Sequence, residues 1–265
     1  YNRYFIKEGS KGTHFFKQQA YSPINYLDAA GQWREINYRL KPDVNVPGVF
    51  QASQQPTPFI LDLNSRYSSV QLNGDKLKFN KDLQLIHVDD NGKRTSLGNG
   101  DWTNFTAGDD GVRIMDFYPG IDIAFTFSTG FMETSFILKH KTQFVGGYLV
   151  MQQDIEFPQG MKFIDEVSNQ HTDLYIGKED RVPVFTIEKC YAYDNSASTQ
   201  RQDLPVSVEQ GNSLAVFTSV NWLNDPATKY PVVIDPVVTT SNSLAAATIA
   251  GTQFSPVCWT NSCDY

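Results

Sequence analysis

The chain has 265 residues, of which 40% are hydrophobic, 13% are aromatic and 19% are charged, and its net charge is −7. Because it has no run of basic residues, it offers nothing to attract a nucleic-acid backbone, and we expect no nucleic-acid partner. No apolar run reaches the length of about 18 residues that a membrane-spanning helix needs, so we expect no membrane insertion. Phe and Tyr, at 18 and 13 residues against 4 Met, favour half-buried strands.

Short strand-like runs follow one another along the first hundred residues, with turn sequences between them. These runs cover residues 4–7, 14–18, 24–27, 33–40, 59–63, 69–72, 77–79 and 83–88. Asn-Gly dipeptides supply the positive φ angles that tight hairpin turns need. Asp90-Asn91-Gly92 therefore predicts a hairpin between residues 83–89 and 93–98.

The clearest strand pattern lies in residues 112–138. Apolar side chains recur there with a period close to two, and the turns Tyr118-Pro119-Gly120 and Ser128-Thr129-Gly130 interrupt the series. Alternation of this kind is typical of strands that bury one face. The segment therefore predicts a β-hairpin with one buried face.

Further strand-like runs lie at residues 147–152, 173–176, 184–192, 206–209, 214–217 and 231–238. Strands that recur about every 8 to 12 residues between turns are typical of sandwiches. We therefore expect an all-β fold, an antiparallel β-sandwich in one large part or two, over residues 1–238. A sub-boundary is expected near residues 108–111. Residues 239–265 are rich in small and polar residues, and we expect an extended C-terminal segment that is either a linker or the first strand of a following module.

The three cysteines divide into a pair and a single residue. Cys258 and Cys263 flank a short polar loop, and in an oxidising compartment we expect them to form a disulfide. Zinc binding and free thiols are the alternatives, although two thiolates supply only half of a zinc site. Cys190 lies in an alternating run and is expected to be a thiol of the core.

Two aspartates, Asp122 and Asp235, are the carboxylates considered for chemistry. A carboxylate pair can perform acid–base catalysis or bind calcium, but neither has a His, a Lys or a second acid at a useful spacing in the sequence. An Asp in a hairpin can instead accept backbone N–H groups, and Asp235-Pro236 suits a chain that leaves a sheet edge. We therefore predict structural roles for both, with no catalytic residue, cofactor or metal.

Among the four tryptophans, Trp102 is the candidate for ligand contact. It lies in a predicted loop, where an exposed indole could form a platform for carbohydrate, whereas Trp33 and Trp222 are expected to anchor the core. The sequence has none of the short nucleotide-binding, zinc-protease or hydrolase motifs. A catalytic triad assembled from distant residues would leave no such motif.

Two segments carry a resemblance to a known family. Residues 111–138 contain Tyr118-Pro119-Gly120-Ile121-Asp122, and residues 221–238 end in a Tyr-Pro-x-x-Ile-Asp-Pro run that includes Asp235 and Pro236. Together these motifs resemble the N-terminal β-rich region of large, secreted surface proteins of the Bacteroidetes type. The segment 22–40 also resembles the start of such regions, and of some wall proteins with YD repeats.

The resemblance implies a non-enzymatic structural or adhesive module, located outside the cell on a bacterial surface protein. In that family, modular repeats follow the region, and a gliding-motility-type or type IX sorting domain often lies at the far C-terminus. The expected partners are neighbouring modules of the same polypeptide or further copies of the chain, which pair through edge strands or the C-terminal segment. A carbohydrate-binding module that contacts surface glycans is the alternative, and a secreted hydrolase is the third.

Overall fold

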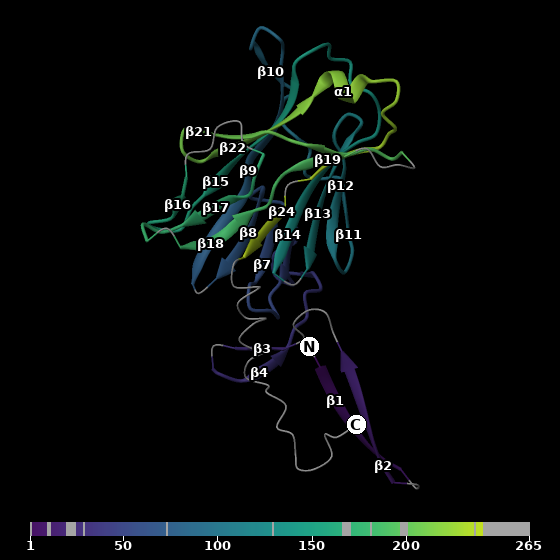
Figure 1. Ribbon diagram of the computed structural model, residues 1–265, viewed down its shortest axis with the longest axis vertical. Coiled ribbons are helices and arrows are strands. Elements are labelled where there is room, and N and C mark those ends of the chain that lie inside the picture. The colour runs from purple at the N-terminus through teal and green to yellow at the C-terminus, as the bar shows by residue number, and fades with distance from the viewer. Residues whose placement is uncertain are drawn as a thin grey trace.

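The computed structural model describes residues 2–9, 12–19, 25–28, 30–72, 74–128, 130–165, 171–180, 182–196, 201–235 and 237–240. For 2–9, 12–19, 237, 239 and 240, only the backbone is described. Two large antiparallel sheets dominate the molecule and pack face to face (Figure 1). This arrangement confirms the expected all-β sandwich. The described residues form one short helix, α1 (Val220–Asn224), which lies at the end of the sandwich that also carries β10 (Arg94–Ser96) (Figure 1).

The first sheet is built around one long strand, β9. In spatial order it contains β21 (Val206–Glu209), β22 (Ser213–Ser219), β15 (Tyr148–Glu156), β9 (Asp75–Val88), β8 (Tyr67–Leu72), β7 (Phe59–Asp62), β6 (Val49–Ala52) and β5 (Lys41–Pro42). β10 pairs with the end of β9, with Arg94 opposite Val88, which confirms the hairpin predicted at residues 90–92. The two runs expected at 77–79 and 83–88 belong to this single strand.

The second sheet begins with the segment whose strand pattern is clearest in the sequence. In spatial order it contains β11 (Phe105–Ala107), β12 (Gly111–Tyr118), β13 (Ile121–Ser128), β14 (Phe131–Leu138), β24 (Val237–Thr240), β18 (Pro183–Ile187), β17 (Leu174–Gly177) and β16 (Lys162–Phe163). β12 pairs with β13 and β13 pairs with β14, so residues 112–138 form two consecutive hairpins, a three-stranded meander.

The last described strands lie inside the second sheet, not at its edge. β23 (Val232–Asp235) pairs with β14 and with β19 (Tyr191–Tyr193), which in turn pairs with β20 (Arg201–Asp203). β24 lies between β14 and β18 and bonds to both. The last two described strands, β23 and β24, therefore connect β14 to β19 and to β18 within the second sheet.

Two small hairpins precede the sandwich. β1 (Asn2–Gly9) pairs with β2 (Gly12–Gln19), and β3 (Asn25–Leu27) pairs with β4 (Trp33–Glu35). Figure 1 shows both beyond the end of the sandwich that lies opposite α1 and β10. The chain then enters the sandwich through an isolated bridge in which the Asn37 N–H donates to the Gln54 carbonyl over 2.7 Å.

One continuous hydrophobic core fills the space between the two sheets, with members from Leu40 to Val238. Phenylalanine rings are its largest fully buried side chains, and Phe59 of β7 meets Phe127 of β13 with ring centroids 5.8 Å apart. Burial of each such ring contributes about 1.5–3 kcal/mol to folding. Strand alternation explains the pattern, because every second residue of each strand faces the opposite sheet.

Candidate functional site

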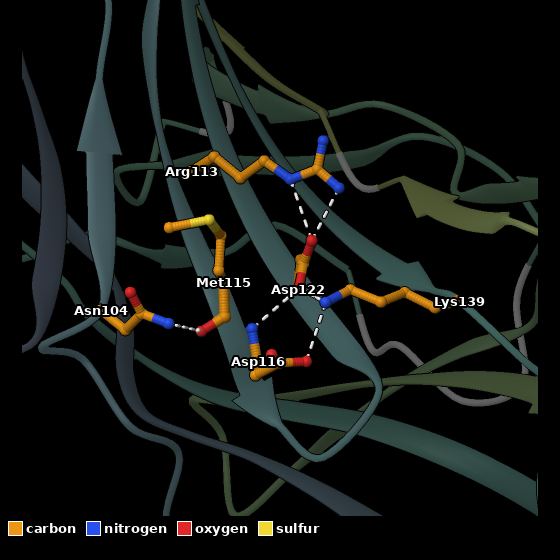
Figure 2. Close-up of polar contacts among 6 residues, drawn as sticks. All are labelled: Asn104, Arg113, Met115, Asp116, Asp122 and Lys139. Carbon is orange, nitrogen blue, oxygen red and sulfur yellow. Dashed lines mark hydrogen bonds and ion pairs between the residues drawn. The ribbon is translucent and has the colours of Figure 1, made fainter.

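Asp122, the aspartate of the first motif, lies in β13 with only 2% of its side chain exposed. Its carboxylate accepts hydrogen bonds from Nε and Nη2 of Arg113, over 3.0 and 2.6 Å, and from the backbone N–H of Asp116 over 2.8 Å. Nζ of Lys139 lies 2.7 Å from its other oxygen (Figure 2). These cationic partners come from the neighbouring strands β12 and β14, so the spacing of residues in the sequence did not indicate them.

The Asp122 carboxylate contacts a β-bulge in the neighbouring strand β12. The register between β12 and β13 shifts between Ile114 and Tyr118, and within that bulge Asp116 adopts a φ of 50°. Left-handed backbone of this kind is uncommon outside glycine and needs compensating contacts. The bond from Asp116 N–H to Asp122 supplies one, and Met115 N–H donates to the Asn104 carbonyl over 2.8 Å on the other side. The Asp122 carboxylate thus supports the left-handed backbone of the bulge in β12.

The electrostatics of this cluster keep Asp122 ionised. Burial opposes the charge and is the largest single effect, but the hydrogen bonds from Lys139, from the backbone of Asp116 and from Arg113 together lower the pKa of the carboxyl. The pKa of Lys139 is raised in turn, first by its hydrogen bond to Asp116 and then by the one to Asp122. A carboxylate held in this way is a permanent anion at neutral pH and cannot donate a proton.

Asp235, the aspartate of the second motif, lies in the opposite environment. It is 4% exposed at the end of β23, and its Oδ1 atom has no hydrogen-bond partner. Burial, followed by the negative charge of Glu133, raises the pKa of Asp235 to about 7, while a hydrogen bond from Tyr191 acts in the other direction. Nothing in the sequence pattern indicated this second acid, which β14 brings alongside β23.

Around the Asp235–Glu133 pair, the polar contacts are few. Glu133 accepts a hydrogen bond from the hydroxyl of Ser135 over 2.7 Å, and the guanidinium of Arg201 lies 3.7 Å from the ring centroid of Tyr191. A carboxyl group that holds a proton near neutral pH is of the kind that can act as a general acid. Within the described ranges, no three His, Cys, Asp or Glu side chains are grouped so that they could hold a metal ion.

Trp102 is not the exposed platform that the sequence suggested. Only 7% of it is accessible, because it packs edge-on against Phe117 and stacks on Phe125, with centroids 5.2 and 5.9 Å apart. This packing requires glycine at position 100, because a Cβ there would lie 2.0 Å from the Phe117 ring. The indole is part of the core and offers no face to a ligand.

The other tryptophans and the cysteines give mixed outcomes. Trp33 is 48% exposed, so the expectation that it anchors the core was wrong, whereas Trp222 on α1 does pack against the core. Cys190 is buried as predicted, and burial raises the pKa of its thiol to about 12. Pro236, Cys258 and Cys263 lie outside the described residues, so the disulfide stays a prediction.

The Tyr118-Pro119-Gly120 turn lines a cavity of about 600 Å³, a feature that the sequence pattern did not indicate. The Tyr118 hydroxyl accepts from the Leu85 N–H and donates to the Gly98 carbonyl, both over 3.2 Å, and so joins this turn to the first sheet. The remaining wall comes from the loop after β14 and from residues around β10.

A second apolar cluster lies on the first sheet, on the face away from the core. Its buried members are Ile86, Val150 and Ala215, with Val88 and Phe217 packed against them. Tyr148 makes an edge-on contact with Phe217 at 6.0 Å and remains 45% exposed. Sheets of this type usually present polar residues to solvent on the face that is not in the core. This cluster is therefore an apolar area on a face where polar residues are the rule.

No family model, curated protein or solved structure matches the chain. Among the described residues, no helix is long and apolar enough to cross a membrane.

Proposed function

We propose that this protein is a non-enzymatic structural and adhesive module of a bacterial surface protein, located outside the cell. The two motifs that resemble secreted surface proteins of the Bacteroidetes type support this proposal, and the aspartates of both motifs lie in strands of the second sheet. Both motif aspartates have partners within the fold: Arg113 and Lys139 for Asp122, and Glu133 and Tyr191 for Asp235. We therefore propose that both aspartates have structural roles and no catalytic one.

The observation that carries the proposal is the accessible part of the outer-face cluster, which consists of Tyr148, 45% exposed, and the half-buried Val88 and Phe217. A contact surface needs apolar area that a partner can cover and polar groups around it. Beside the cluster, Arg94 donates to Glu209 over 2.8 Å and to Gln152 over 2.5 Å, which places a charged and polar network at its margin. We infer that a neighbouring module or a second copy of the chain packs on this face.

The edges of the sheets are less suited to assembly than this face. The strands at the ends of the sheet orders, β5, β21, β11 and β16, have two to four residues each. Short edge strands offer few unpaired backbone groups, which is a common protection against strand addition. We therefore favour association through the outer face over the edge pairing that the sequence suggested.

A charged substitution on the outer face tests the proposal. Tyr148→Arg should abolish self-association measured by sedimentation velocity at high protein concentration, because it places a charge in the centre of the apolar contact. Tyr175→Arg is the matched control, since Tyr175 is 41% exposed and lies on β17 of the other sheet. Electron microscopy of the unmodified chain provides the second readout. Dispersed monomers at all concentrations, or equal association in both variants, would contradict the proposal.

A further inference from the structure

The cavity beside the Tyr118-Pro119-Gly120 turn is lined by residues of both sheets, and Thr95 and Ser96 of β10 form part of its wall. Leu97, which follows β10, and Leu149 of β15 come from the first sheet's side, and Ile121 and Leu138 come from the second. Its volume of about 600 Å³ falls within the range of about 300–1,000 Å³ that is usual for small-molecule sites.

The floor of the cavity is apolar and well supported. Leu138 and Leu149 are 1% exposed, and Leu97, Ile121 and Phe144 are partly buried against the core. The position of Phe144 is fixed from behind, because its ring stacks on His87 with centroids 4.3 Å apart and an interplanar angle of 16°. His87 is itself held by a hydrogen bond between its Nε2 and the Gly146 carbonyl, over 3.0 Å.

The rim of the cavity is polar and carries no acidic residue. Thr95, His140 and Lys141 lie there, exposed to solvent, and none of the residues that line the cavity is Asp or Glu. Lys141 is oriented by the end of α1, where its Nζ donates to the carbonyls of Asn224 and Asp225 over 3.1 and 3.2 Å. Lys141 is the one Lys or Arg among the residues that line the cavity, so the rim carries a single positive charge in a chain whose net charge is −7.

We propose that the cavity binds a small amphiphile with an apolar body and a carboxylate head. The apolar body would lie on Leu97, Ile121 and Phe144, where water is displaced from already half-buried surface. The carboxylate would lie at the rim, where the Lys141 ammonium supplies the complementary charge and the Thr95 hydroxyl is a donor. The absence of acids from the lining removes the repulsion that an anion would meet over most of this protein's surface.

Calorimetric titration of the full chain with decanoate and with decanol tests the proposal, since the two probes share the apolar body and differ in the head group. We expect decanoate to bind at one site, and decanol to bind at least about tenfold more weakly. Thr95→Asp should weaken decanoate by about tenfold through repulsion at the rim and leave decanol unchanged. Thr106→Asp is the matched control, because Thr106 is exposed on β11 and does not line the cavity.

A second variant guards against an ambiguous result at the exposed rim. Leu97→Asp places a carboxylate in the apolar floor and should abolish binding of both probes, with circular dichroism used to confirm that the variant is folded. Should it fail to fold, Ile121→Thr replaces it, with a weaker loss expected for both probes. Absence of decanoate binding, equal affinity for decanol, or full affinity in Thr95→Asp would each overturn the proposal.

Discussion

Asp122 and Asp235 are the same residue type, lie in the same sheet and are both almost fully buried, yet their charges are controlled in opposite directions. Asp122 is surrounded by Arg113, Lys139 and a backbone N–H, and its pKa is lowered. Asp235 faces Glu133 and has an oxygen without a partner, and its pKa is raised to about 7. The environment of each side chain, and not its motif, decides whether it is a fixed anion or a proton carrier.

The difference arises from strand pairing. β13 lies between β12 and β14, so Asp122 meets basic side chains from both neighbours. β23 lies between β14 and β19, which bring an acid and a tyrosine to Asp235. Sequence spacing conveys none of this, because the partners across a sheet depend on register. The comparison leads to predictions of opposite sign for the two aspartates.

The largest effect is expected from Asp122→Ala. The substitution removes the partner of Arg113 and of Lys139, and it leaves the Asp116 N–H unpaired within the bulge. Because Arg113 is 50% exposed and can recover its hydration, we expect a loss of about 3 kcal/mol in the free energy of unfolding, not the larger loss of a fully buried pair. Urea denaturation at pH 7 measures it.

Asp75→Asn provides the control for that experiment. Asp75 also pairs with a lysine, Lys178, but the two side chains are 29% and 51% exposed. Ion pairs at such a surface contribute little, so a change within about 0.5 kcal/mol is expected. Equal losses in Asp122→Ala and Asp75→Asn would show that the Asp122 cluster does not stabilise the bulge.

Asp235→Asn should have the opposite sign above neutral pH. The pKa of Asp235 rises from its ordinary value of 3.8 in the unfolded chain to about 7 in the folded one, so the native state holds a proton that the unfolded chain releases. Stability attributable to Asp235 is therefore complete below pH 4 and is lost as pH rises through 7. Each pKa unit corresponds to about 1.4 kcal/mol, which bounds the cost at about 4 kcal/mol, and we expect Asp235→Asn to gain about 2 kcal/mol at pH 8.

The pH profile is the diagnostic measurement for Asp235. Thermal unfolding between pH 4 and pH 8 should show a stability that declines up to about pH 7 in the unmodified chain and a flatter one in Asp235→Asn, with the two curves meeting near pH 4. Glu133→Gln should move the decline to lower pH, because it removes the second largest cause of the raised pKa and leaves burial, the largest, in place. Parallel curves for the unmodified chain and Asp235→Asn would mean that this carboxyl is ionised throughout.

Much of the fold was predictable because strand alternation and turn chemistry are local. The turns at residues 90–92 and 118–120 placed two hairpins correctly, and the run at 206–209 coincides with β21. The run at 184–192 is divided in the structure into β18 and β19, which pair with different partners. Alternation continues through such a change of partner, so the pattern alone cannot locate it.

The candidate site was less predictable because its features depend on contacts between distant residues. Trp102 was expected to be exposed from its polar neighbours, but Gly100 lets the loop lie on Phe117 and bury the indole. The partners of the two aspartates and the residues that line the cavity come from strands far apart in the chain. The sequence predicted the turn at 118–120, but it did not indicate that this turn lines a cavity.

The smallest effect is expected at Asp116, and it separates charge from backbone geometry within the Asp122 cluster. Asp116 is 58% exposed and bonds to Lys139 over 2.8 Å, so Asp116→Asn removes a surface ion pair while keeping a residue that tolerates a φ of 50°. We expect a change within about 0.5 kcal/mol by urea denaturation. Asp116→Val should cost about 1–2 kcal/mol more, because a β-branched side chain is strained in that conformation. If the two variants were equally stable, the backbone at Asp116 would not be held in its left-handed form, and the bond from Asp116 N–H to Asp122 would not be what stabilises the bulge.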